Sequence, residues 1–173
     1  MKFPEWWEAP DEIQELDGNC GPIAAWSVLH YFGKRISAAR IISSCRYTKR
    51  HGVFSVHMAA GLSEMGLQVS FHSEEDHEIG EFEKRGYARA RRLGISVDPP
   101  IELPVLLRQR RYGRIPIVLY DTASGSGHFS TLLGARGSTL RLPLAEKGAM
   151  PTDEFLVAWS APKILRQCII AGK

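Results

Sequence analysis

The sequence predicts an α+β fold in which helices come first and an antiparallel sheet comes second. An apolar run from Ile23 to Phe32, too apolar on every side for a surface helix, predicts a buried central helix. In the second half, short apolar segments at 115–120, 128–133 and 139–142 predict strands joined by turns. Helices followed by strands are typical of the α+β class.

The composition is that of an ordinary soluble protein. The chain has 173 residues, 44% hydrophobic and 24% charged, and we expect one domain over 1–173. Its net charge of +3 is too small to indicate a nucleic-acid partner. Cys20, Cys45 and Cys168 form no short-spaced pair, so no disulfide framework is expected.

The N-terminal residues show no secretory signal, and no apolar run is long enough to cross a bilayer. We therefore expect a cytoplasmic protein with no membrane span. Export by a route that uses no cleaved signal stays open. The sequence does not indicate an oligomeric state.

The central helix is expected to begin at Cys20 and to end at Gly33. Asn19 is a candidate N-cap, and Pro22 suits a first helical turn, where its missing N–H costs nothing. Residues 1–19 are expected to be irregular, because two prolines and a polar turn interrupt them.

Further elements follow from the same rules. Ser37 is a candidate N-cap for a short helix through Ile42, a third helix is expected over 56–65, and 67–71 alternates like a strand. The second half should hold a helix over 103–111, the three strands, a helix ending at Trp159 and a last strand over 165–171.

The segment 74–100 differs in character from the rest. It begins with acidic side chains and continues with basic ones, the polarity that a helix dipole favours, although Gly80 and Gly86 weaken a helix there. We interpret it as a charged insertion. It is either a solvated helix or a lid or docking surface near a cleft.

Cys20 at the start of a buried helix is the main candidate for chemistry. The positive end of a helix dipole favours the thiolate, which is the nucleophilic form of cysteine. Free N–H groups at the same end can hold a negative oxygen, and Gln14, six residues upstream, can add a side-chain donor. His128 opens a strand after the glycine-rich loop 123–127, so its ring can reach a helix end at the sheet edge.

These pieces together resemble the papain-like cysteine peptidases, and within them the bacteriocin-processing (double-glycine) peptidases and their stand-alone relatives. The matching parts are Gln14, the Cys20-Gly-Pro22 helix start, the Gly-His128-Phe strand that ends at Gly134, and the preceding Pro-Ile-Val-Leu-Tyr strand. The resemblance implies a papain-like fold with Cys20 as nucleophile, His128 as general base and then acid, and Gln14 as an oxyanion donor. It implies hydrolysis of a peptide or isopeptide bond through a thioester.

One position departs from that family. Its members usually place an Asp or Asn after the histidine strand to orient the imidazole, and Leu142 stands there in this chain. Leucine accepts no hydrogen bond. The orienting group must then be another one, such as Glu146, Asp121 or a backbone carbonyl, or the site is slow or inactive.

Two alternatives stay open beside the peptidase. The protein could be a papain-like deamidase or acyltransferase, acting as an effector or toxin, or a catalytically silent domain that binds a peptide. The expected partner is a peptide or protein substrate, not a nucleic acid. No cofactor is expected, and no metal, because the histidines follow no metal-binding pattern. His57 is expected to be a satisfied polar group on an apolar helix.

Overall fold

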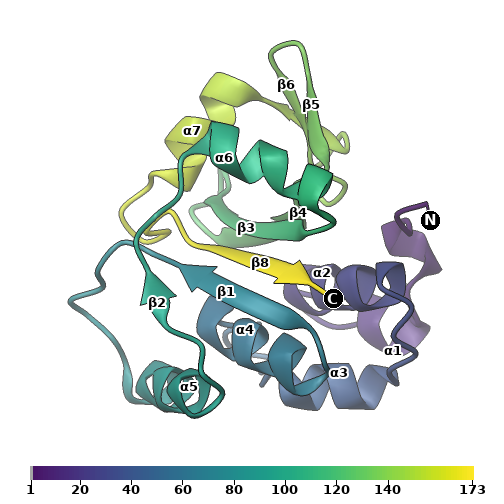
Figure 1. Cartoon of the computed structure of the whole chain (residues 1–173), viewed down its shortest axis with the longest axis vertical. Coiled ribbons are helices and arrows are strands. Elements are labelled where there is room, and N and C mark those ends of the chain that lie inside the picture. Colours follow the sequence, from purple (N-terminus) through teal and green to yellow (C-terminus); the bar gives the residue numbers. More distant parts are fainter. Residues whose placement is uncertain (1) are drawn as a thin grey trace.

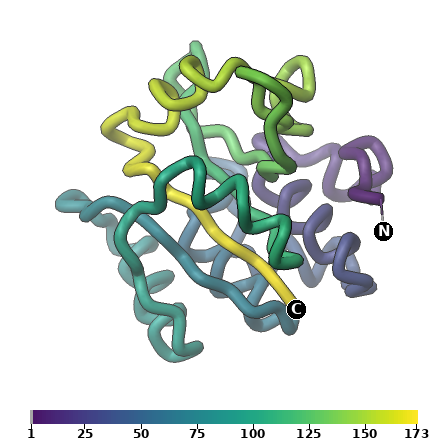
Figure 2. Tube along the Cα trace, turned by 45° about the horizontal axis from the view of Figure 1, so that its top comes forward, coloured from purple at the N-terminus to yellow at the C-terminus, as the bar shows by residue number. Residues whose placement is uncertain are grey.

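A five-stranded sheet crosses the centre of the computed structural model, which describes residues 2–173 (Figures 1 and 2). Its strand order is β2-β1-β8-β3-β4. The strands are β1 (Gln68–His72), β2 (Val97–Asp98), β3 (Ile115–Asp121), β4 (Gly127–Thr131) and β8 (Cys168–Gly172). All neighbours are antiparallel except β1 and β2, which run parallel.

The α+β prediction is confirmed, with one difference in the sheet. The sheet is not purely antiparallel, because the short strand β2 joins β1 in parallel. The C-terminal strand β8 lies between β1 from the first half and β3 from the second. The sheet thereby joins the two halves of the chain.

One face of the sheet is covered by helices of the first half (Figure 1). These are α2 (Cys20–Tyr31), α3 (Ala38–Ser44) and α4 (Ser55–Glu64), and α5 (Glu81–Arg92) packs on the outside of α4. The apolar run 23–29 is buried throughout, as the sequence predicts. The Ser37 hydroxyl accepts the N–H of Arg40, so the predicted N-cap of α3 is confirmed.

The other face carries α6 (Leu103–Arg108), the 3-10 helix η2 (Gln109–Tyr112) and α7 (Thr152–Trp159), with a small sheet beside them. That sheet consists of β5 (Gly134–Arg136), β6 (Thr139–Arg141) and β7 (Ala149–Pro151), all antiparallel. Successive side chains of β3 point to opposite faces of the sheet. Ile115 and Ile117 join the core under α2 and α4, whereas Val118 and Tyr120 join the core under α7.

The N-terminal segment is more regular than the sequence suggests. It forms a 3-10 helix η1 (Trp6–Glu8) and a short helix α1 (Asp11–Gln14). Acidic Asp11 and Glu12 in the first turn suit the positive end of the α1 dipole, and Ile13 anchors α1 in the core. The prediction of an irregular 1–19 was therefore wrong for these stretches.

One other prediction needs correction. Residues 74–80 are irregular, so the charged helix begins only at Glu81. Strand β7 was not foreseen, because its three residues carry no alternating pattern. No helix among residues 2–173 is both long and apolar enough to span a membrane.

Candidate active site

The Cys20 side chain lies at the first residue of α2, against the edge strand β4. No side chain caps this helix end: Asn19, the predicted N-cap, instead donates its amide to the backbone oxygen of Gln14 at 2.6 Å. That bond ties α1 to the start of α2. The backbone N–H of Cys20 at the start of α2 is thus not capped by Asn19, which leaves it available to an anion at this helix end.

His128 is brought to the sulfur by its place on β4. It is the second residue of the strand, and its ring lies close enough to the Cys20 side chain for each group to shift the pKa of the other. Its Nε2 donates to the backbone oxygen of Leu144 at 2.7 Å. Since a carbonyl only accepts, Nε2 carries the proton and the nitrogen that faces the sulfur is Nδ1. A neutral His128 therefore presents a lone pair to the thiol.

The two groups shift each other's pKa toward the charged pair. Burial raises the pKa of Cys20, but the hydrogen bond and charge of His128 and the backbone N–H groups of Phe129 and Gly21 outweigh it, so the pKa is lowered. Burial lowers the pKa of His128, but the Cys20 hydrogen bond and charge and the Leu144 carbonyl leave it raised. Both directions favour a thiolate beside an imidazolium.

The orienting group is a main-chain carbonyl. Leu142 is fully buried in the core beneath α7 and plays no part in holding the ring. Two residues later, the backbone of Leu144 makes two bonds to side chains of β4. The Leu144 oxygen accepts a bond from His128, and the Leu144 N–H donates to the Ser130 hydroxyl at 3.1 Å. Of the alternatives weighed from the sequence, the backbone carbonyl is the one that binds the ring.

The two carboxylates considered for this role lie near the ring without bonding to it. Asp121 and Glu146 line a cavity of about 740 Å³ beside His128, between the β3–β4 loop, the 144–147 loop and α7. The Asp121 carboxylate accepts the N–H of Thr122 instead. A cavity of this size can take several residues of an extended peptide.

Gln14 is placed close by in sequence but is engaged elsewhere. Its amide nitrogen donates to the backbone oxygens of Ala9 at 2.6 Å and Trp7 at 3.1 Å. Both amide hydrogens are therefore used inside the N-terminal segment. To donate to an oxyanion, as the resemblance implies, the Gln14 amide must release at least one of these carbonyls.

Tyr120 is a neighbour of the pair that sequence reasoning missed. It lies directly opposite His128 in the β3–β4 register, and the two rings meet edge to face at 5.4 Å. Its hydroxyl is buried and has no hydrogen-bond partner within residues 2–173, and burial together with the Cys20 charge raises its pKa. The hairpin register would have placed Tyr120 here, had the ends of both strands been known.

The comparisons with known proteins bear on the fold. No protein-family model matches the chain, and no curated protein matches it significantly. Solved structures do match it, among them three that are each 14% identical in sequence.

A C39-like peptidase from Bacillus anthracis matches over 99% of this chain and 95% of its own, with a TM-score of 0.65. The peptidase domain of Streptococcus ComA, a bifunctional ABC transporter of a quorum-sensing pathway, matches over 89% of this chain and 91% of its own, with a TM-score of 0.58. A double-glycine-motif protease from an AMS/PCAT transporter, solved in complex with the leader peptide, matches over 89% of this chain and 84% of its own, with a TM-score of 0.54.

The chain therefore has the fold that double-glycine peptidases share, as the sequence resemblance implied. At this level of identity the likeness concerns the fold alone. The comparisons assign no role to Cys20, His128 or Gln14.

Proposed function

We propose that the protein is a cysteine peptidase that hydrolyses a peptide or isopeptide bond through a thioester on Cys20. One observation carries the proposal: Cys20, at an uncapped helix start, lies beside His128, each group shifts the pKa of the other toward the charged form, and the Leu144 carbonyl fixes Nε2 of His128. The peptidase fold of the structural neighbours supports the same assignment.

The steps follow from the positions of the protons. Nδ1 of His128 takes the thiol proton of Cys20, and the thiolate attacks the substrate carbonyl carbon. The resulting oxyanion lies at the start of α2, where the backbone N–H of Cys20 can donate to it. When the C–N bond breaks, Nδ1–H of His128 protonates the leaving amine and a thioester remains.

Water completes the cycle. Nδ1 of His128 takes a proton from a water molecule, whose oxygen attacks the thioester carbonyl. The C–S bond then breaks, a carboxylic acid leaves and the thiol of Cys20 is restored. Throughout, Nε2–H of His128 stays bonded to the Leu144 oxygen, so the ring keeps one orientation.

A carbonyl in place of a carboxylate changes the strength of the base and leaves its geometry intact. A carbonyl dipole stabilises the imidazolium less than a full negative charge does. The Ser130 bond to Leu144 compensates by fixing where that dipole points. We therefore propose an active enzyme in which Cys20 and His128 form a dyad.

Gln14 enters the proposal as a second oxyanion donor. Removal of one such donor typically lowers kcat by about 10²–10³. Because the Trp7 and Ala9 carbonyls hold its amide, the donation requires the N-terminal segment to shift when substrate binds. The backbone N–H of Cys20 needs no such movement.

The substrate is proposed to be an extended peptide that lies along the cavity beside His128. One structural neighbour is a double-glycine-motif protease that was solved in complex with a leader peptide. Peptides with a glycine pair before the cleaved bond are therefore the first to test.

Mass analysis of a peptide library tests the proposal. We expect the native protein to cut a subset of peptides and, in H₂¹⁸O, to place one ¹⁸O in each new carboxyl group. Cys20→Ala should give no cleavage. The matched control Cys45→Ala should cleave like the native protein, because Cys45 is buried away from the site and burial raises its pKa to about 12.

Other outcomes separate the alternatives. Conversion of glutamine or asparagine side chains to acids with the chain intact would favour a deamidase over a peptidase. Tight peptide binding without any covalent turnover would favour a silent binding domain. Cleavage that persists in Cys20→Ala would contradict the proposal outright.

A further inference from the structure

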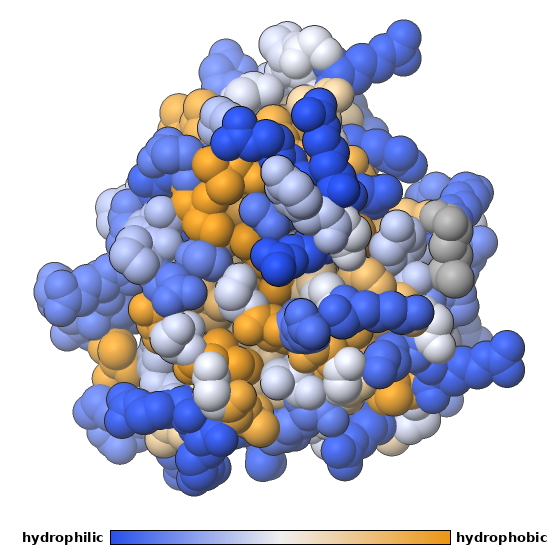
Figure 3. Space-filling view, in the orientation of Figure 1, coloured by the Kyte–Doolittle hydropathy of each residue, from blue (hydrophilic) through white to orange (hydrophobic). Residues whose placement is uncertain are grey.

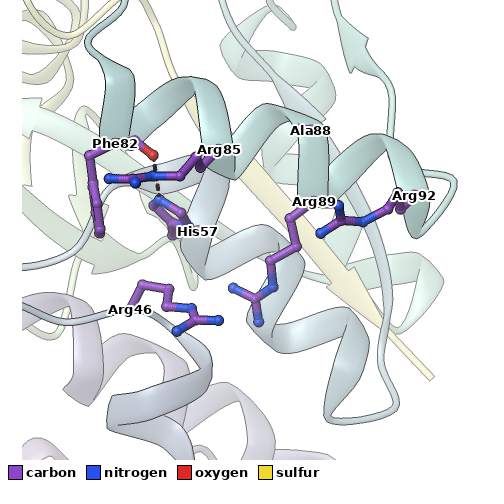
Figure 4. A pocket seen from close by; sticks show the side chains of 7 residues that line it. All are labelled: Arg46, His57, Phe82, Arg85, Ala88, Arg89 and Arg92. Atoms are coloured by element: carbon purple, nitrogen blue, oxygen red, sulfur yellow. Dashed lines mark hydrogen bonds between the residues drawn. The ribbon is translucent and has the colours of Figure 1, made fainter.

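A second cavity, of about 460 Å³, lies between α4 and α5 and is lined mainly by arginines (Figure 4). Four guanidinium groups surround it, and no carboxylate lines it; the complete lining is Arg46, His57, Phe82, Arg85, Ala88, Arg89 and Arg92. In Figure 3 hydrophilic side chains gather over the lower part of the molecule, where Figure 1 places α5. None of these residues lines the cavity beside His128.

The positive charge of this cavity is only partly compensated. Arg89 is buried and makes two bonds to the Glu64 carboxylate, at 2.6 and 2.8 Å, and one to the Ser44 oxygen. Among residues 2–173 no ion pair is formed by the other three arginines, Arg46, Arg85 and Arg92. Of the four lining arginines only Arg89 is paired with a carboxylate, which leaves three positive charges without an ion-pair partner among residues 2–173.

The walls of the cavity are built by close packing of α5 on α4. Gly86 makes this possible, because a Cβ at this position would lie 2.7 Å from Val56 and 3.1 Å from the His57 ring. The Phe82 and His57 rings pack at a tilt of 47° with centroids 4.5 Å apart, and Arg85 lies over the Phe82 ring at 5.8 Å. The arginines therefore project from a fixed frame.

His57 contributes an unmet hydrogen bond to the same frame. Its Nε2 donates to the Phe82 backbone oxygen at 3.0 Å, while its Nδ1 is buried and has no partner in the part of the chain that the structure describes. The expectation of a fully satisfied His57 was therefore wrong. A buried polar atom without a partner costs about 1–3 kcal/mol. Because Nε2 carries the proton, Nδ1 is an acceptor, and only a donor such as water or a protonated phosphate oxygen can satisfy it.

We propose that this cavity binds a small, multiply charged anion of the diphosphate class. Arginine forks fit phosphate oxygens in pairs, and guanidinium groups stay charged at every physiological pH. A single carboxylate would neutralise only one of three excess charges, whereas a diphosphate carries about that number. The volume suits a small molecule and excludes a folded partner.

The chemistry of a diphosphate can come from an inorganic ion or from a nucleotide. The two sources differ in that only a nucleotide carries a base, which can contact the Phe82 side chain in the cavity lining. Both sources share the phosphate contacts, so both are tested. The proposal is independent of any activity at Cys20.

Calorimetric titration of the whole chain at about 0.15 M salt tests the site, because non-specific attraction is largely screened there. The probes are inorganic pyrophosphate, adenosine diphosphate and a tetraglutamate peptide. We expect saturable binding of pyrophosphate that weakens about tenfold or more in each of the variants Arg46→Gln and Arg92→Gln. The matched control is Arg91→Gln, which removes the neighbouring exposed charge of α5 and should bind as the native chain does, since Arg91 does not line the cavity.

Each outcome decides one question. Tighter binding of adenosine diphosphate than of pyrophosphate assigns a nucleotide, and equal or weaker binding assigns the bare diphosphate; both support the site. Preferential binding of tetraglutamate would overturn the phosphate assignment in favour of an acidic peptide. No saturable binding, or equal losses in the Arg91→Gln control, would overturn the proposal.

Discussion

Replacement of His128 by alanine is expected to lower kcat/KM for a cleaved peptide by about 10²–10⁴. The variant loses the base that takes the Cys20 proton and the acid that protonates the leaving amine. It also loses the hydrogen bond and the charge that hold the pKa of Cys20 down, while the burial that raises this pKa remains. Steady-state kinetics on a peptide identified by the library measures the effect.

A control for this variant lies on the same helix as the nucleophile. His30 is exposed at the far end of α2, and His30→Ala should leave kcat/KM unchanged. An activity of His128→Ala within a few-fold of the native protein would contradict the assigned role of His128. Far-ultraviolet circular dichroism checks that both variants are folded.

Replacement of Arg89 by methionine is expected to lower the free energy of unfolding by about 2–3 kcal/mol. Arg89 joins three elements: it sits on α5, pairs with Glu64 of α4 and donates to the Ser44 carbonyl in the last turn of α3. Methionine keeps the apolar stem and removes all three bonds. The loss is smaller than for a fully enclosed pair, because the Glu64 side chain is 31% exposed.

Urea unfolding measures this change, and Lys84→Met is the matched control on the same helix. Lys84 pairs with Glu81 at 2.6 Å, but both side chains are mostly exposed. Such pairs contribute little, so the free energy of unfolding should stay as in the native protein. Equal destabilisation by both variants would show that loss of any α5 cation has this effect, and would contradict the role of the Arg89 network.

The sequence was informative where one residue type has a local reason for its place. The apolar run after Cys20 indicated a buried helix, and Ser37 indicated a helix start; both are found. The papain-like resemblance, carried by Gln14, Cys20 and His128, agrees with the fold of the structural neighbours. The prediction of 74–100 as an insertion stays a prediction.

Contacts between residues far apart in the chain were harder to predict from the sequence. Nothing local at Leu142 or Leu144 indicates that a backbone oxygen will bind an imidazole sixteen residues away. Backbone carbonyls leave no trace in a sequence. The position of Gln14 was inferred from spacing alone, and the Trp7 and Ala9 carbonyls that hold its amide come from two short helical turns that the prolines concealed.

The alkylation rate of Cys20 as a function of pH tests the central claim, the pairing of Cys20 with His128, most directly. A lowered pKa means that the thiolate is present at pH values below the usual thiol range, so iodoacetamide should modify Cys20 there. In His128→Ala the pH at which the alkylation rate of Cys20 rises should be higher than in the native protein. Cys45, with a pKa raised to about 12, should stay unmodified in the folded protein. A native profile that rises only at or above the pH of an ordinary thiol, and that is unchanged in His128→Ala, would contradict the account.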